Sequence, residues 1–142
     1  MQSIIAGLFK NLAKALSVFL DKVLPDISHD WWRDLVVNVL TLQQRRHIEQ
    51  KNLSSLTSFD LVALIRIFDQ NWHLIAPKKN FSSEQRHFVK EMQTVRNRWA
   101  HAGSESFPND IIYRDIDTIQ RFASMIDSPG DLILKITELT GC

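Results

Sequence analysis

Side chains that could carry chemistry lie close together in the stretch Arg96-Asn97-Arg98-Trp99-Ala100-His101. The imidazole of an unperturbed histidine has a pKa of about 6.5, so a histidine such as His101 is suited to moving a proton near neutral pH. A guanidinium stays charged and offers a fork of donors to phosphate oxygens, which suits Arg96 to holding a phosphate. Metal-independent cleavage of a phosphodiester such as the RNA backbone needs both kinds of group. We therefore take His101, Arg96 and Asn97, one helical turn before His101, as candidate catalytic residues.

A purely structural role is the alternative for the same residues. A histidine at the end of a helix commonly interacts with the last carbonyl groups and with the helix dipole. Arginines on either side of such a residue are commonly solvated. The six-residue stretch by itself leaves both interpretations open.

The charge distribution favours an anionic ligand near this stretch. Residues 77–101 contain six basic and two acidic residues, whereas residues 102–142 contain three basic and seven acidic ones, although the whole chain has a formal net charge of only +1. A local basic excess suits a phosphate backbone. The alternative is that the basic helix docks on an acidic neighbour, for example the C-terminal part of the same fold. Under the first interpretation the RNA-binding cations are Arg98, Lys90, Arg86, Lys78 and Lys79.

The elements that must position these residues all have helical spacing. Apolar residues recur every three or four positions, the alternation typical of strands is absent, and Pro25, Pro77 and the Gly103–Pro108 and Pro129–Gly130 segments separate helix-length pieces. The expected helices cover residues 3–24, 30–50, 58–76, 82–103, a stretch after Pro108, and residues 132–139. We predict an all-α fold, an up-and-down bundle of about five to six helices. Residues 1–142 form one domain, either a whole protein or the N-terminal module of a larger one.

The helix that carries the candidate residues should begin with a capping box made by Ser82 and Gln85. At about 100° per residue its apolar positions form one wedge, and Arg96 and His101 lie about 140° apart. A site that uses both therefore needs the length of the arginine side chain, a helix end at His101, or a second copy of the helix across a twofold axis, and we favour the last of these, a homodimer. The wedge consists of Phe88, Met92, Val95 and Trp99.

Residues 91–103 (EMQTVRNRWAHAG) resemble the signature of the HEPN superfamily, in which an arginine and a polar residue precede a histidine by a short spacing. Residues 61–66 (LVALIR) and 68–72 (FDQNW) resemble the preceding helix of the Swt-type subgroup. That subgroup is named after a eukaryotic nuclear RNA-surveillance endonuclease and also occurs beside helicase or ATPase modules in bacterial phage-defence proteins. The resemblance covers about residues 58–103.

The resemblance implies an HEPN-like bundle that acts on RNA. Many members of the superfamily are metal-independent endoribonucleases that pair as dimers, which implies a role in RNA processing or anti-phage defence. Others keep the fold as a non-catalytic module that binds RNA or serves protein assembly, for example by docking a helicase or ATPase partner. Both alternatives remain open at this point.

Other kinds of site have little support in the sequence. The remaining histidines have no metal-ligand spacing, no glycine-rich phosphate loop is present, and the single cysteine is Cys142, so we expect no metal and no cofactor. Lys10 and Lys14 interrupt the apolar N-terminal stretch, which argues against a signal peptide and a membrane span. The single cysteine is consistent with a reducing, cytoplasmic location, which we expect. The remaining histidines are His29, His47, His73 and His87.

Overall fold

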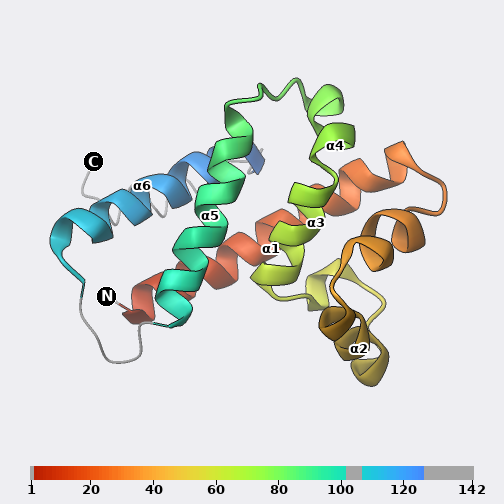
Figure 1. The fold of residues 1–142 in the computed structure, drawn as a ribbon, viewed down its shortest axis with the longest axis horizontal. Coiled ribbons are helices and arrows are strands. Elements are labelled where there is room, and N and C mark those ends of the chain that lie inside the picture. The colour runs from red at the N-terminus through yellow and green to blue at the C-terminus, as the bar shows by residue number, and fades with distance from the viewer. Residues whose placement is uncertain (1, 102–106, 127–142) are drawn as a thin grey trace.

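The computed structural model describes residues 2–101 and 107–126, and within these ranges the chain is helical with no strand. The prediction of an all-α bundle is confirmed (Figure 1). The expected helix over residues 132–139 lies outside the described residues. The elements in order are α1 (Gln2–Ile27), η1 (Trp32–Val36), η2 (Val37–Val39), α2 (Leu42–Lys51), η3 (Leu56–Ser58), α3 (Leu61–Gln70), α4 (Trp72–Lys79), α5 (Gln85–Ala100) and α6 (Asn109–Ile126).

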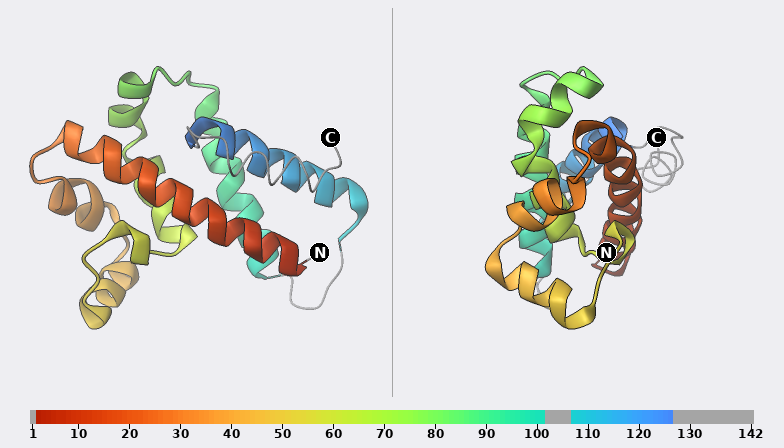
Figure 2. Two further views of the ribbon diagram at one scale, coloured as in Figure 1. Left: turned by 180° about the vertical axis from the view of Figure 1, so that it is seen from behind. Right: turned by 90° about the vertical axis from the view of Figure 1, so that its right-hand side faces the viewer.

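Helix α1 packs against most of the later helices. It contacts η3, α3, α4, α5 and α6, and Figure 2 shows it running along most of the length of the molecule. By length and composition alone the stretch Ser3–Ile27 could also span a membrane, a property that the apolar core helix of a folded domain shares. The helical spacing of Leu8, Leu12, Leu16, Phe19 and Val23 predicts an apolar stripe, and all five side chains are buried, each at most 9% exposed.

The prediction of one continuous helix over residues 30–50 is wrong. The chain instead forms a π-helical turn and a 3-10 turn, becomes extended at Leu40, and starts α2 afresh at Leu42. Thr41 caps α2 with a complete capping box, in which its hydroxyl accepts from the Gln44 N–H and the Gln44 side chain accepts from the Thr41 N–H. Arg66 of α3 holds the preceding turn, since its Nε donates to the Val39 carbonyl at 2.6 Å.

The predicted helix over residues 58–76 is also divided, at Asn71. The Asn71 side chain is buried, and its Nδ2 donates to the carbonyl oxygens of Leu35 at 2.7 Å and Ile67 at 2.8 Å. Helix α4 then continues past Pro77 to Lys79 and ends at Asn80, whose φ of 57° is left-handed. Asparagine tolerates this conformation better than most residues, so it can end a helix there.

Helix α5 packs between α3 and α6. The buried residues of its wedge are Val89, Met92 and Val95, whereas the predicted wedge residues Phe88 and Trp99 are only half-buried. The predicted Ser82–Gln85 box is half formed, because the Gln85 side chain accepts from the Ser82 N–H at 2.8 Å but the Gln85 N–H bonds to the Ser82 carbonyl instead of its hydroxyl. The helix therefore begins at Gln85 rather than Ser82.

Candidate functional site

Arg96 lies on α5 at a point where several grooves meet, and its side chain is half-buried. The α2–α3 groove lies between residues 40–53 and 59–63 and has a volume of about 500 Å³. The α1–α3 groove lies between residues 9–17 and 57–61, with about 660 Å³. Two further grooves are smaller. The α1–α5 groove lies between residues 5–9 and 96–100 and has a volume of about 310 Å³. The α3–α5 groove lies between residues 62–66 and 93–97, is also lined by residues 41 and 44, and has a volume of about 220 Å³. Arg96 lines all four.

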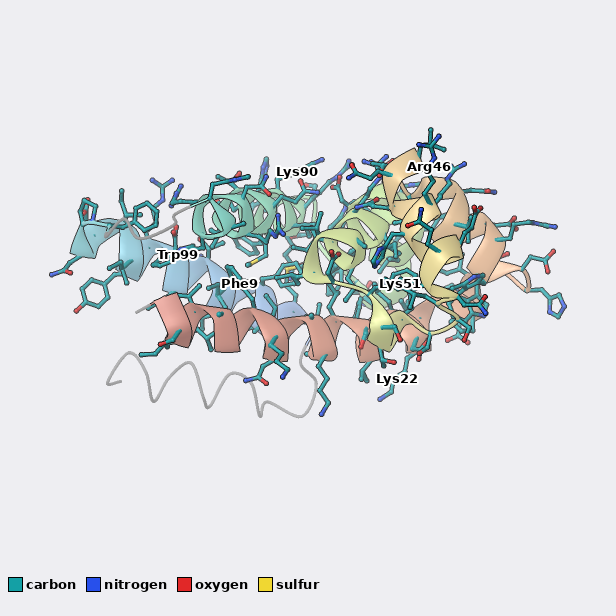
Figure 3. All side chains as sticks on the ribbon, turned by 90° about the horizontal axis from the view of Figure 1, so that it is seen from below. Phe9, Lys22, Arg46, Lys51, Lys90 and Trp99 are labelled. Carbon is teal, nitrogen blue, oxygen red and sulfur yellow. The ribbon has the colours of Figure 1, made fainter. Side chains whose placement is uncertain are left out.

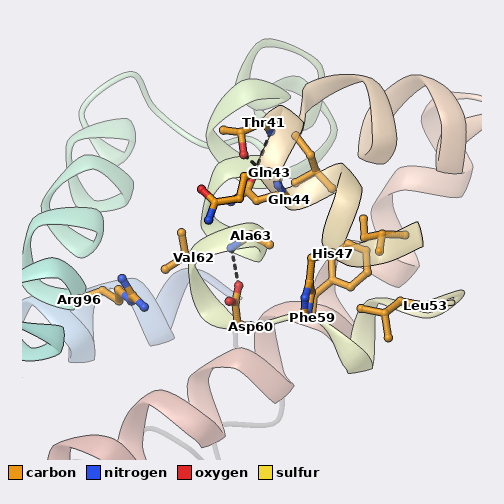
Figure 4. Close-up of a pocket in the computed structure, with 12 residues that line it drawn as sticks. Thr41, Gln43, Gln44, His47, Leu53, Phe59, Asp60, Val62, Ala63 and Arg96 are labelled. Carbon is orange, nitrogen blue, oxygen red and sulfur yellow. Dashed lines mark hydrogen bonds between the residues drawn. The ribbon is translucent and has the colours of Figure 1, made fainter. Parts of the chain in front are cut away.

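Asn97 lies beside Arg96 and shares the α3–α5 groove with it. The Arg96 Nη1 donates to the Asn97 Oδ1 at 3.5 Å, a long hydrogen bond that leaves the guanidinium with unused donors. Among the described residues, no carboxylate forms an ion pair with Arg96. Figure 4 shows its guanidinium directed toward Val62 and Asp60.

His101 is placed at the C-terminal end of α5, and its side chain is exposed. Its backbone N–H donates to the Asn97 carbonyl at 3.2 Å, while no hydrogen bond of its imidazole is found within residues 2–101 and 107–126. His101 lines none of the four grooves that contain Arg96. Arg96 and Asn97 thus share a groove that His101 does not line.

Arg98 is engaged inside the fold. Its Nη1 lies 2.6 Å from Oδ1 of Asp115, a residue of α6 that is 1% exposed. The neighbouring Trp99 donates its Nε1–H to the other oxygen of Asp115 at 2.8 Å. The sequence left open whether the basic helix docks on an acidic neighbour in the same fold, and for Arg98 the structure shows such docking.

Lys90 and Arg86 pair with a second buried carboxylate, Asp69 of α3, which is 3% exposed. The Lys90 Nζ lies 2.7 Å from Oδ2, and the Arg86 Nε lies 3.5 Å from Oδ1, which accepts no hydrogen bond from the described residues. Both cations keep about half of their side-chain surface exposed. In Figure 3 Lys90 lies on the side of α5 away from α1.

The two remaining predicted RNA-binding residues, Lys78 and Lys79, are exposed at the end of α4. Lys79 lies over the ring of Phe19, with Nζ 5.7 Å from the ring centroid. Neither residue lines a groove that contains Arg96. The structure thus distributes the predicted cations over the molecule and does not gather them around Arg96.

Other residues that the sequence did not single out line the grooves of Arg96. His47 and Gln43 of α2 line the α2–α3 groove, and Lys10 and Lys14 of α1 line the α1–α3 groove. The Thr41-x-x-Gln44 spacing was the available signal for α2, because a capping box marks a helix start and sets which face follows. Nothing in the sequence indicates that this face turns toward Arg96.

The family model described as Swt1-like HEPN matches residues 8–127 of this chain. The chain belongs to the Swt1-like HEPN family. The match extends from α1 to the end of α6 and includes the whole stretch from Arg96 to His101. The predicted HEPN membership is thus confirmed, and it supports an RNA-related role for the domain. No curated protein and no solved structure matches the chain.

Within the part of this HEPN domain that the structure describes, no group of three or more His, Cys, Asp or Glu side chains is placed to hold a metal ion. The groups available for chemistry around Arg96 are therefore guanidinium, amide, imidazole and ammonium groups, with Asp60 as the carboxylate that lines the two larger grooves. Such a set can bind a phosphodiester and move a proton.

Proposed function

We propose that this HEPN domain is an RNA-binding module that cleaves RNA as a homodimer without a metal ion. The observation that carries the proposal is the position of Arg96 at the junction of four grooves, without a carboxylate partner among the described residues. A guanidinium in this situation has donors available for a phosphate. Such an enzyme would serve RNA processing or anti-phage defence in the cytoplasm.

The chemistry assigned to the site is an internal transesterification of RNA. His101 takes the proton of a ribose 2′-hydroxyl, whose oxygen bonds to the adjacent phosphorus while the bond from phosphorus to the 5′-oxygen breaks. The leaving oxygen receives a proton from a second imidazolium or from water, so the products are a 2′,3′-cyclic phosphate and a 5′-hydroxyl. Arg96 stabilises the negative charge that gathers on the phosphate oxygens, and Asn97 orients the Arg96 guanidinium.

The proposed dimer is supported by the arrangement of the two residues in one chain. His101 is exposed at the end of α5 and lines none of the four grooves that contain Arg96, so we propose that a second subunit completes the pair. A twofold axis near the end of α5 would bring His101 of one subunit to Arg96 of the other.

The test is cleavage of single-stranded and structured RNA in EDTA by the wild-type protein and by Arg96→Ala and His101→Ala variants. General acid–base catalysis contributes on the order of a hundredfold or more, so each variant should lose at least about that factor in rate. The matched controls are His73→Ala and Arg121→Ala, whose side chains are exposed on α4 and α6 and should leave the rate unchanged. Wild-type protein that binds no RNA would overturn the proposal.

Mixing the two inactive variants tests whether the site is shared. Half of the randomly formed dimers contain one subunit of each kind, and each of these has one complete Arg96–His101 pair across the interface, so roughly a quarter of the wild-type rate should return. No recovery in a sample in which native mass spectrometry detects mixed dimers would contradict the shared site.

A second candidate is a non-catalytic HEPN module that binds RNA and docks a helicase or ATPase partner. The observation that favours it is that none of the four grooves contains both Arg96 and His101, so RNA binding at Arg96 does not depend on the histidine. Binding that is lost in Arg96→Ala, kept in His101→Ala, and not followed by cleavage in the wild type would support this candidate.

A further inference from the structure

The α2–α3 groove has the size and lining of a small-molecule subsite. Its volume of about 500 Å³ lies in the range of pockets that hold ligands. The floor is apolar, with Phe59 and Val62 among its residues, and the rim is polar. Figure 4 shows Arg96 and His47 on opposite sides of the groove with Asp60 between them. A flat, apolar ligand with polar edges and an attached anion suits this lining.

The rim offers both donors and acceptors to such a ligand. The amide of Gln43 is exposed and makes no hydrogen bond among the described residues, so it can donate and accept. Asp60 uses Oδ1 to cap α3, accepting from the Ala63 N–H at 3.0 Å, and keeps Oδ2 as an acceptor. The exposed imidazole of His47 presents a flat face for stacking.

The adjoining α1–α3 groove provides positive charge in line with this subsite. It shares Phe59, Asp60 and Arg96 with the α2–α3 groove and adds the exposed Lys10 and Lys14 of α1. Residues four apart on a helix lie on one face, so the two ammonium groups follow the groove together. Arg96 therefore lies between the α2–α3 groove, which suits a flat ring, and the α1–α3 groove, whose lysines suit phosphate groups.

We infer that the α2–α3 groove binds one unstacked base of single-stranded RNA, with His47 stacking on the base and Gln43 reading its edge. The phosphate of that nucleotide lies at Arg96, and neighbouring phosphates lie along Lys10 and Lys14. Duplex RNA is excluded from the groove because its bases are paired and stacked inside the helix. The inference rests on the proposed function and specifies its substrate as unpaired RNA.

The test measures binding of a labelled twelve-nucleotide single-stranded RNA by fluorescence anisotropy, in EDTA at pH 8, where an unperturbed histidine is neutral. All proteins carry His101→Ala so that the RNA stays intact. A stacked base contributes enough that His47→Ala should weaken binding by about five- to a hundredfold, whereas His47→Phe should restore most of the affinity because it keeps a stacking face. Gln50→Ala on the same helix and His73→Ala on α4 are exposed, lie outside the groove, and should bind like the parent.

Two further ligands identify what the groove recognises. A duplex RNA and an abasic ribose-phosphate strand of the same length should bind the parent and His47→Ala equally, because neither presents an unstacked base. Equal affinity of the parent and His47→Ala for the single strand would overturn the inference and leave the proposed function intact. The same loss on the abasic strand would show that His47 acts on the backbone and would also overturn it.

Light scattering on the same variants tests whether the α2–α3 groove binds RNA or a second subunit of the protein. His47→Ala should keep the oligomeric state of the parent. Loss of dimers in this variant would identify the groove as a subunit interface and overturn base binding. A parent protein that binds none of the three nucleic acids would instead remove the proposed function itself.

Discussion

The basic residues of α5 are similar in type but are used differently. Arg98 pairs with Asp115 of α6 and Lys90 pairs with Asp69 of α3, two carboxylates that are 1% and 3% exposed. Arg96 instead lines four grooves, and its side-chain hydrogen bond within the described residues is a long one to Asn97. The comparison shows that the charge of a helix does not predict which of its cations can bind a ligand.

The physical reason lies in the cost of burying a carboxylate. An ionised carboxylate removed from water is expensive unless a cation and hydrogen bonds compensate it. Asp115 and Asp69 therefore each require basic partners, and α5 supplies them while it packs on α6 and α3. Arg96 faces grooves lined largely by apolar and amide groups, so its charge stays available for a phosphate.

The largest effect should be the loss of stability in Arg98→Met, with Arg96→Met as its matched control. Arg98→Met leaves the Trp99 N–H as the side-chain donor to the buried Asp115 within the described residues, so the free energy of unfolding should fall by about 2–4 kcal/mol. Arg96→Met should change it by less than about 0.5 kcal/mol. Urea denaturation followed by circular dichroism measures both.

The affinity for RNA should respond to the same two substitutions in the opposite order, with the larger loss in Arg96→Met. Arg96→Met should lose affinity for single-stranded RNA, and Arg98→Met, measured well below its denaturation midpoint, should keep it. Two variants with the same stability loss, or an Arg98→Met protein that folds normally but no longer binds RNA, would contradict the difference between Arg96 and Arg98.

A smaller effect should follow from Trp99→Phe. The change keeps an aromatic ring but removes the N–H that donates to Asp115, a hydrogen bond to a charged group, so about 1–2 kcal/mol of stability should be lost. Trp31→Phe is the matched control, because Trp31 is half-buried against Trp32 and its indole N–H makes no hydrogen bond among the described residues. Equal melting temperatures of the two variants would show that Asp115 does not need this donor.

The smallest effect should appear in the salt dependence of RNA binding. Each phosphate contact to a single strand contributes a slope of about −0.7 in log affinity against log salt. Arg96→Met should therefore reduce the slope by about that amount, while Arg98→Met should leave it unchanged. Anisotropy titrations at several salt concentrations give the slopes, and a reduced slope in Arg98→Met would place that residue on the RNA after all.

The spacing of apolar residues predicted much of the fold. The stripe of α1 is buried as expected, and α3, α5 and α6 lie where helical spacing placed them. The breaks at Leu40 and Asn71 were not predicted, because both are stabilised by contacts distant in the sequence, from Arg66 to the Val39 carbonyl and from Asn71 to the Leu35 carbonyl. Only the capping box at Thr41 and Gln44 was a local signal for the first break.

The candidate site divides in the same way. The sequence alone determined the types of group on α5, their order, the local basic excess and the family, because all of these are properties of neighbouring residues. The tertiary structure decided that Asp115 engages Arg98, that Asp69 engages Lys90, and that His47 lines a groove with Arg96. Each of those pairings joins residues that the chain separates widely, and whether a charge is buried or free is settled only when helices pack.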